Sequence, residues 1–258
     1  MKERHLTAVA FYGHKPPQLR DLIARCQQSI CARIGGDFVP YELAQVHATL
    51  IGLEGVWTEG RLVQAHFAQG GVERPLDLAG LTDFLLHTPL LPMQMRLGGF
   101  EPSQDYGFTS FGRHPAERSF DIQRTGAAVL MGWPFATARA SDALYRLRRE
   151  FLRFNARHKY HRSDEDIDND LYFVLGTLDD QAATDADRTE VTRSIRAELS
   201  NVEPIVLDLD RTWISLVTYE DRRLPPQTST ALPLERDGRL VDASALLTEV
   251  EGAISAAR

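Results

Sequence analysis

His47 and Thr49 stand two residues apart in the stretch Gln-Val-His-Ala-Thr-Leu-Ile-Gly, which covers positions 45–52. The apolar residues around them predict a buried strand over positions 46–53, and alternate strand residues point to the same face. A titratable ring beside an uncharged hydroxyl can hold one anionic oxygen between them. A histidine in an apolar strand is also often a hydrogen-bonded structural residue, so both roles stay open at this point.

Composition and charge limit the class of protein. The chain has 258 residues, 43% of them hydrophobic, which is enough for a sizeable core. Its formal net charge of -7 disfavours binding to a long nucleic-acid duplex, whereas a small phosphate-bearing ligand or a single RNA end remains compatible. The N-terminus has no hydrophobic signal core, and no apolar run of about 18 residues could span a membrane. We therefore expect a cytoplasmic protein without a membrane partner.

No familiar metal or cofactor signature occurs in the sequence. Cys26 and Cys31 are five positions apart on a predicted helix, where they suit neither a disulfide nor a metal pair. The patterns GxxxxGK[ST], GxGxxG, GxSxG and HExxH are absent. The sequence thus predicts no metal site and no cofactor.

Turn residues and apolar periodicity divide the chain into short strands and a few helices, without a regular alternation of the two. Strands are predicted at positions 5–12, 46–53, 91–100, 106–111, 120–123, 127–132 and 171–178, with one or two more over 204–219. Helices are predicted from Pro16 to about position 33, at 58–68, 141–157 and 189–200, and from about 242. This mixture favours an α+β fold.

One regularity indicates an internal repeat. Leu19 precedes His47 by 28 residues, and Leu144 precedes Tyr172 by the same number. An offset of 125 therefore superposes two predicted helices and also two predicted strands, Val46–Leu50 and Leu171–Leu175. Two related halves are expected from this match.

With this order of elements, the chain resembles the 2H phosphoesterase superfamily, which includes the bacterial RNA 2′,3′-cyclic phosphodiesterases also called 2′-5′ RNA ligases. In that family two pseudo-symmetric α+β lobes each contribute a strand with the motif His-x-Thr/Ser-apolar to a shared cleft. The first motif matches His47-Ala48-Thr49-Leu50. The resemblance implies two lobes of antiparallel-rich sheet with helices outside and a central cleft. We expect this bilobal domain at 1–225, and a polar linker with a C-terminal helix at 226–258.

The second motif departs from the family pattern. The chain has Tyr172-Phe173-Val174-Leu175 there, so tyrosine replaces the histidine and valine replaces the hydroxyl residue. The frame Trp213-Ile214-Ser215-Leu216 keeps a serine, but the topology assigns the strand after the long helix. Three histidines in predicted loops could restore the missing imidazole or could be ordinary solvated side chains: His114, His158 and His161.

The resemblance implies a metal-free reaction in which one imidazole acts as base, the other protonates the leaving oxygen, and two hydroxyls steady the phosphate. His47 and Thr49 would supply one half of this site. Tyr172 is a poor base at pH 7, because an unperturbed phenol has a pKa near 10. It can still donate a hydrogen bond to a phosphate, or it can be a half-buried aromatic whose hydroxyl is satisfied locally. His47, Thr49 and Tyr172 are the candidate catalytic residues, with Tyr172 also a candidate ligand contact.

Charged residues crowd the region before the second motif. Arg146, Arg149, Arg153 and Arg157 recur every three or four residues and form a basic stripe on the predicted helix. The stripe is either a solvated helix face or a contact for ligand phosphate, and Arg146 and Arg149 are the candidate ligand-binding residues. The acidic run over 164–170 is interpreted as a charged loop, because it lacks the glycine and glutamate of a calcium loop.

These features lead to one leading hypothesis and two alternatives. The leading hypothesis is a 2H phosphoesterase-like protein that acts on or binds a cyclic phosphate, a 2′-5′ oligonucleotide or an RNA end through His47 and Thr49, with attenuated, metal-independent phosphodiesterase chemistry. The first alternative is an inactive module that binds a nucleotide or an RNA end. The second is a protein-interaction domain in which His47 is merely buried. Fold analogy cannot separate these, because function resides in the site.

Overall fold

The computed structural model describes positions 4–58, 61–69, 74–158, 161, 163–178 and 184–255. Its strands are β1 (His5–Ala10), β2 (Phe38–Pro40), β3 (Ala48–Gly52), β4 (Gly55–Thr58), β5 (Arg61–Gln64), β6 (Met93–Leu97), β7 (Phe120–Ile122), β8 (Ala127–Ala136), β9 (Arg139–Ala140), β10 (Leu171–Leu178), β11 (Ile205–Leu209), β12 (Ile214–Tyr219), β13 (Ser229–Pro233), β14 (Glu235–Arg236) and β15 (Arg239–Leu240). Its α-helices are α1 (Pro17–Ile34), α2 (Ala65–Gln69), α3 (Leu78–His87), α4 (Pro115–Arg118), α5 (Ala143–Phe151), α6 (Asp185–Ser200) and α7 (Ala243–Ser255).

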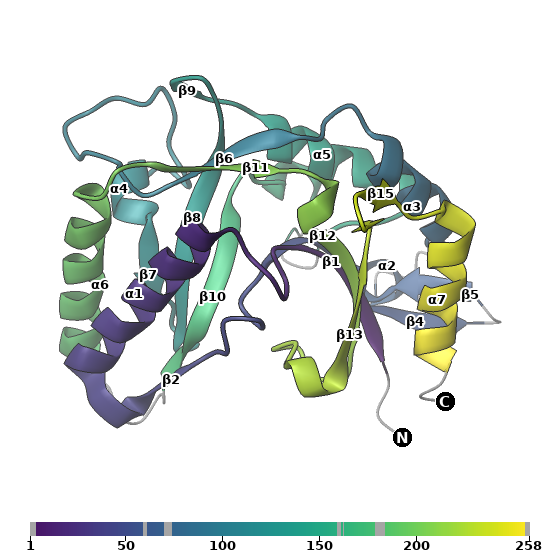
Figure 1. Cartoon of the computed structure of the whole chain (residues 1–258), viewed down its shortest axis with the longest axis horizontal. Helices are drawn as coiled ribbons and strands as arrows, with labels where there is room; N and C mark the ends of the chain where they lie inside the picture. The colour runs from purple at the N-terminus through teal and green to yellow at the C-terminus, as the bar shows by residue number, and fades with distance from the viewer. Residues whose placement is uncertain are drawn as a thin grey trace.

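The main sheet has the strand order β11-β6-β8-β10-β3-β1-β12-β13, with β2, β7 and β9 paired beside this path (Figure 1). All of its described pairs are antiparallel. From the centre outward, one half runs β3, β1, β12, β13, and the other runs β10, β8, β6, β11. The predicted α+β class and antiparallel-rich sheet are confirmed, and the strand order is symmetric about its centre.

The two halves meet where the motif strands pair. Ala48 of β3 lies opposite Phe173 of β10 in the antiparallel register, and both side chains are fully buried. These positions are 125 apart, which is the offset found in the sequence. The two strands that the sequence offset relates are therefore direct neighbours in the sheet.

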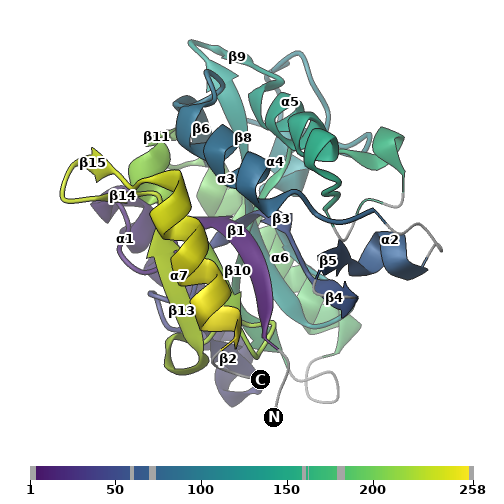
Figure 2. The ribbon, with the colours of Figure 1, turned by 90° about the vertical axis from the view of Figure 1, so that its right-hand side faces the viewer.

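Helices cover the face of the sheet that carries the large core. Helix α1 follows β1 of one half but packs against β10 of the other half and against α6. Helix α7 packs on α3, β12 and β13 (Figure 2). Because α1 crosses between the halves, they share one core. None of the described helices has the length and apolar composition needed to cross a membrane.

Buried polar side chains on α1 and α5 hold the two motif strands. Gln27 of α1 donates through Nε2 to the carbonyl oxygen of Leu175 at 2.8 Å. Arg148 of α5, which is 4% exposed, donates to the carbonyl oxygens of Thr49 at 3.1 Å and Leu50 at 3.3 Å. Leu50 and Leu175 are equivalent under the offset of 125. Each motif strand is thus fixed at the equivalent carbonyl by a helix side chain.

The helix predicted at 58–68 is wrong for most of its length. The structure has a hairpin of β4 and β5, in which Val56 pairs with Val63, and only α2 is helical. Apolar residues in so short a stretch fit both the helical and the strand period. Cross-strand pairing decides in favour of strands.

The strand predicted at 106–111 is also wrong. Within this stretch, Tyr106 packs edge-on against Phe100 with 5.2 Å between ring centroids, and its hydroxyl donates to the carbonyl oxygen of Gly99 at 3.2 Å. Phe108 packs on Trp133 at 5.6 Å. The aromatic residues that suggested a strand instead anchor a loop to the sheet.

The C-terminal segment belongs to the main fold. Strand β13 extends the sheet beside β12, and α7 buries Leu246, Val250 and Ile254 in the large core. The segment predicted as a polar linker therefore contains an edge strand. A polar sequence that includes proline is compatible with that position, because one side of an edge strand needs no ladder partner.

We expect Arg148→Met to lower the free energy of unfolding by about 3 to 5 kcal/mol, because losing one member of a buried ion pair leaves the other uncompensated. The partner is Asp168, whose side chain is 19% exposed. Arg149→Met on the same helix is the matched control, since Arg149 is exposed, and it should change this free energy by less than about 0.5 kcal/mol. Urea unfolding followed by circular dichroism measures both. Equal losses would contradict the clamping role of Arg148.

Asp168 should make the stability pH-dependent. Burial raises its pKa, but the hydrogen bond from His161 and the charge of Arg148 outweigh burial and hold the pKa at about 2. This lies below the unfolded value near 4, so the stabilisation is present above pH 4 and is lost as the pH falls through 2. Through Asp168, the free energy of unfolding of the parent should fall by about 2 kcal/mol between pH 5 and pH 2. We expect Asp168→Asn to lack this part of the pH dependence. Urea unfolding at both pH values measures this, with the exposed Asp208→Asn as control; an unchanged pH dependence in Asp168→Asn would refute the assignment.

Candidate functional site

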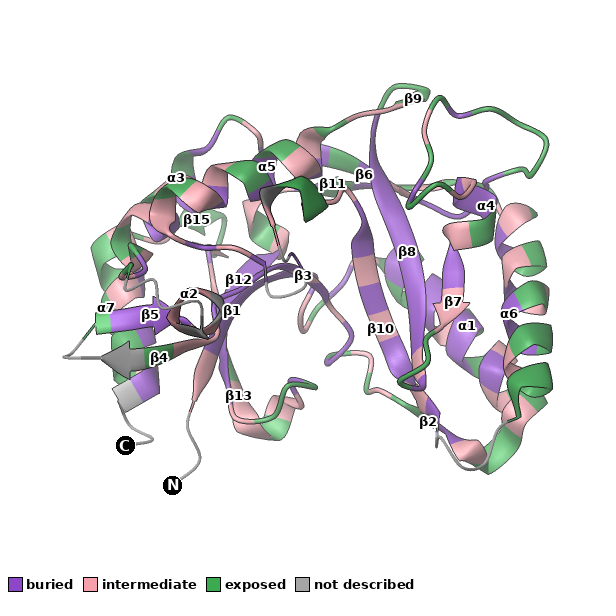
Figure 3. Ribbon diagram, turned by 180° about the vertical axis from the view of Figure 1, so that it is seen from behind, coloured by how far each residue is buried: buried purple, intermediate pink, exposed green. Residues whose placement is uncertain are grey.

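The residues of the two motifs lie on one face of the sheet, at the joint between its halves. Ala48 and Phe173 point into the core, so the residues on either side of each point to the opposite face. These flanking residues are half-buried, and Figure 3 shows the alternation of buried and half-buried residues along β10. An antiparallel register continued outward from the pair of Ala48 and Phe173 sets Thr49 opposite Tyr172, and His47, which precedes β3, opposite Val174.

Local contacts orient the ring of His47. Its Nδ1 lies 2.7 Å from the carbonyl oxygen of Gln45, and because a carbonyl can only accept, Nδ1 donates. The basic nitrogen of the neutral ring is then Nε2. Tyr12 packs edge-on against this ring at 5.8 Å between centroids, and the Tyr12 hydroxyl donates to the carbonyl oxygen of Leu224 at 3.0 Å. His47 is thus held in the tautomer that a general base at Nε2 requires.

Thr49 presents a hydroxyl beside this ring. Its side chain is half-buried and makes no hydrogen bond to another residue in the described ranges. Its backbone carbonyl accepts from the guanidinium of Arg148, which fixes the strand at this position. The hydroxyl can therefore donate to an anionic oxygen without first breaking a contact within the protein.

The hydroxyl of Tyr172 is engaged within the protein. It donates to Asp170 Oδ2 at 3.0 Å and accepts from Arg118 Nη2 at 2.8 Å. Burial, and next the charge of Asp170, raise the pKa of Tyr172 well above its usual range. Local satisfaction of this hydroxyl was one of the two roles expected from the sequence. A phenol in this setting is a weaker acid than an exposed one.

Asp170 organises this second half of the site. It is 3% exposed, and it accepts from Ser110 Oγ and Trp133 Nε1, each at 2.6 Å. Arg118 lies 3.4 Å from the same carboxylate. The acidic run around Asp170 was interpreted as a charged loop, and its last member is instead buried. Sequence reasoning missed Ser110, Arg118 and Trp133, because they precede Asp170 by 37 to 60 residues and form no local pattern with it.

Phe111 stands exposed beside this network. It is 69% exposed, and its backbone φ of 49° lies in the left-handed region, which is strained for phenylalanine. The preceding Ser110 is bound to Asp170, and the Arg118 guanidinium lies 5.3 Å from the centre of the Phe111 ring. An exposed aromatic ring held in this way offers a stacking surface next to Tyr172.

The arginines proposed from the sequence lie on the outer face of α5. Arg146 and Arg149 are both exposed, and Arg146 pairs with Asp142 at 3.0 Å. The arginine of this helix that contacts β3 is the buried Arg148, which the three-to-four spacing of the basic stripe passes over. The spacing of the basic stripe identifies the exposed face of the helix, whereas Arg148 lies on the face that carries the apolar residues. Ligand contact by Arg146 and Arg149 stays a prediction.

The other histidines considered from the sequence have structural contacts. His114 Nε2 lies 2.8 Å from the carbonyl oxygen of Gln104, and its Nδ1 accepts from the backbone of α4. His161 Nε2 lies 3.2 Å from the carboxylate of Asp168. The ring of the buried His158 lies 5.0 Å from the ring of His161, measured between centroids. These contacts give no support for any of the three as a second catalytic imidazole.

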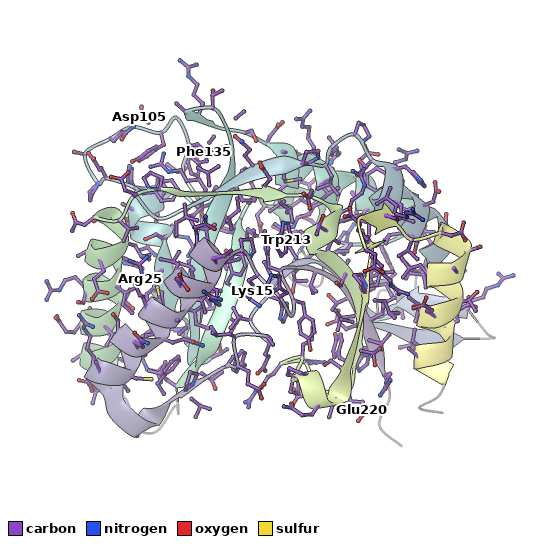
Figure 4. All side chains as sticks on the ribbon, viewed as in Figure 1. Lys15, Arg25, Asp105, Phe135, Trp213 and Glu220 are labelled. Carbon is purple, nitrogen blue, oxygen red and sulfur yellow. The ribbon has the colours of Figure 1, made fainter. Side chains whose placement is uncertain are left out.

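The loop after β1 carries a buried lysine that sequence reasoning missed. Lys15 is 4% exposed and donates through Nζ to the carbonyl oxygen of Gly13 at 3.1 Å. Burial lowers its pKa to about 8. Figure 4 labels Lys15 near the middle of the molecule, close to the label of Trp213. The same loop brings Tyr12 against His47.

A groove of about 770 Å³ lies between α4, β7 and α6, and none of His47, Thr49 and Tyr172 lines it. The central cleft expected between the lobes therefore stays a prediction.

Comparison with known proteins gives similarities at the level of solved structures. No family model matches the sequence, and no curated protein matches it. The chain is similar to Escherichia coli LigT complexed with NADP+, with 12% identity over 91% of this chain and 96% of the other, and a TM-score of 0.40. It is also similar to a phosphoesterase, with 13% identity, 91% and 97% coverage and a TM-score of 0.41. A conserved protein of unknown function from Agrobacterium tumefaciens gives 17% identity, 86% and 82% coverage and a TM-score of 0.44. At these identities and TM-scores, function has to be inferred from the geometry of the site.

Proposed function

We propose that this protein is a 2H phosphoesterase-like protein that takes a small phosphodiester at the joint between β3 and β10, with His47 and Thr49 as its working half-site. The ligand is a cyclic phosphate, a 2′-5′ oligonucleotide or an RNA end. The observation that carries this proposal is the pairing of Ala48 with Phe173, because it sets His47 and Thr49 beside the strand that corresponds to the second motif.

In this proposal His47 acts as the base. With Nδ1 donating to Gln45, the lone pair of Nε2 takes the proton of the attacking water or hydroxyl. The Thr49 hydroxyl donates to a phosphate oxygen and steadies it. No step requires a metal ion, because the base and the phosphate contact both come from side chains.

The second half of the site explains why the proposed chemistry is attenuated. The leaving oxygen needs a proton, but the Tyr172 hydroxyl already donates to Asp170 and its pKa is raised. Val174 cannot donate at all. Arg118 can stabilise negative charge but does not release a proton near neutral pH. A site without its acid loses about 10²- to 10⁴-fold in rate.

Two features support a nucleotide-type phosphodiester. The exposed Phe111 ring beside Arg118 offers a surface on which a base can stack. The second is Lys15, a buried cation in the loop whose Tyr12 ring packs on His47.

A second candidate function is a module that binds such a ligand without turnover. The closed network of Tyr172, Asp170, Arg118 and Ser110 favours it, because each hydrogen bond there is made within the protein. The rates in the two experiments below separate the candidates.

The first experiment replaces the base. We expect His47→Ala to lower the hydrolysis rate of a 2′,3′-cyclic nucleotide by about 10²-fold, because one general base is lost. His87→Ala is the matched control, since its side chain is 63% exposed on α3. Chelator should leave the parent's rate unchanged. Equal rates for parent and His47→Ala would refute catalysis by His47, and a parent that binds the nucleotide without hydrolysis would favour the binding module.

The second experiment rebuilds the missing half. Tyr172→His with Val174→Thr restores the motif on an existing strand, and Asp170 lies where it could orient the new imidazole. We expect hydrolysis faster than the parent by about 10²-fold, because an acid is regained. Burying a threonine hydroxyl without a partner could cost about 1 to 3 kcal/mol, so urea unfolding accompanies the rate measurement. Val174→Thr alone is the comparison variant. A folded double variant no faster than the parent would contradict loss of the second motif as the limit on rate.

A further inference from the structure

The groove between α4, β7 and α6 is separate from the motif residues and has the size of a ligand site. Its volume is about 770 Å³, within the range of small-molecule pockets. One wall is the face of α6 that runs from Asp185 to Ser200, and the opposite wall comes from α4 and from β7 with the turn after it. The lining residues from α6 recur every three or four positions, so the groove follows the length of that helix.

The described lining of the groove is positive in a chain that is negative as a whole. Among the described residues, five arginines and three carboxylates line it, which gives these residues a net +2, whereas the chain carries -7. Arginines come from both walls, with Arg113 and Arg124 on one side and Arg188 and Arg196 on the other. A fifth, Arg193, is paired with Glu190 at 2.6 Å. A ligand that fits this distribution carries negative charge at more than one point.

The described carboxylates do not fully compensate Arg113 and Arg124. Arg113 and Glu117 form an exposed pair at 3.5 Å, and pairs of this kind contribute little. Arg124 makes no hydrogen bond or ion pair with another residue in the described parts of the chain. Such guanidinium groups can turn to an incoming anion at small cost.

Arg196 is the groove arginine that is bound to β7. Its Nε donates to the carbonyl oxygen of Phe120 at 2.8 Å, and its Nη2 lies 3.3 Å from Asp121. Burial lowers its pKa and the nearby Arg113 and Arg118 lower it further, whereas the charges of Asp121 and Glu117 oppose this. A half-buried cation beside two others is stabilised when an anion enters the groove.

We propose that this groove is a second binding site, for a small anion with two linked phosphoryl groups. Arginine binds phosphate through two parallel hydrogen bonds, and arginines on both walls can engage two phosphoryl groups at once. No aromatic residue is among the described residues that line the groove, so these residues offer no stacking platform for the bases of a nucleic-acid strand. The proposal does not depend on the function of His47 and Thr49.

Pyrophosphate binding measured by calorimetry tests this site. The titrations use His47→Ala protein, so that the first motif does not contribute. We expect one pyrophosphate per chain, and an affinity at least about ten-fold weaker when Arg124→Gln and Arg188→Gln are added, because charge-assisted hydrogen bonds from both walls are lost. Arg124→Glu alone serves as a second groove variant. Because Arg124 makes no hydrogen bond or ion pair in the described parts of the chain, its replacement should leave the fold intact. Arg20→Gln with Arg139→Gln is the charge-matched control, since both are exposed outside the groove.

Each result has a defined meaning. Weaker binding in both groove variants and unchanged binding in the control supports the site. Unchanged binding in the groove variants, equal weakening in the control, or no binding by the His47→Ala protein with an unaltered groove overturns it. ADP forms a second arm of the experiment: tighter binding of ADP than of pyrophosphate identifies a nucleoside diphosphate as the ligand, and equal or weaker binding identifies the inorganic diphosphate unit.

Discussion

The backbone pairing of Ala48 with Phe173 is the contact on which the rest of this structure depends, because it joins the two halves of the main sheet, β3-β1-β12-β13 and β10-β8-β6-β11 with its side strands β2, β7 and β9. One such pair could not hold two lobes by itself. Gln27 and Arg148 support it, since each reaches from a helix to the carbonyl of the last motif residue on one of the two strands. These side chains are buried and would be costly without their partners, so the register of the joint is tied to the packing of both helices.

The joint also decides where the chemistry can occur. Because Ala48 and Phe173 face the core, their neighbours face outward together, and two motifs that are 125 residues apart become one surface. The two halves of that surface differ in their polar contacts. Thr49 has a hydroxyl without a contact in the described chain, whereas the Tyr172 hydroxyl is bound between a carboxylate and a guanidinium. Symmetry of the backbone is thus retained while the side chains have diverged.

Asp170 shows how this divergence is stabilised. A buried carboxylate is expensive unless it is paired and hydrogen-bonded, and Asp170 meets this requirement with Ser110, Trp133, Arg118 and Tyr172. The same contacts hold the loop that exposes Phe111. Structure and proposed ligand contact are therefore coupled in this half: the network that satisfies the carboxylate also sets the strained turn beside the site.

Sequence by itself determined the features that repeat locally. The period of apolar residues gave the α+β class and most strands, and the equal spacing of Leu19 to His47 and Leu144 to Tyr172 revealed the two related halves. It also identified His47 and Thr49 as a pair and Tyr172 as the departure from the second motif. Tertiary structure decided what distant residues do to one another. Arg148 lies outside the basic stripe that the sequence spacing identified and proved to be a clamp on β3, and Asp170 looked like part of a charged loop and proved to be buried. Apart from Tyr172, the partners of their side chains named above lie between 20 and 99 residues away, and no local period records a contact across such distances.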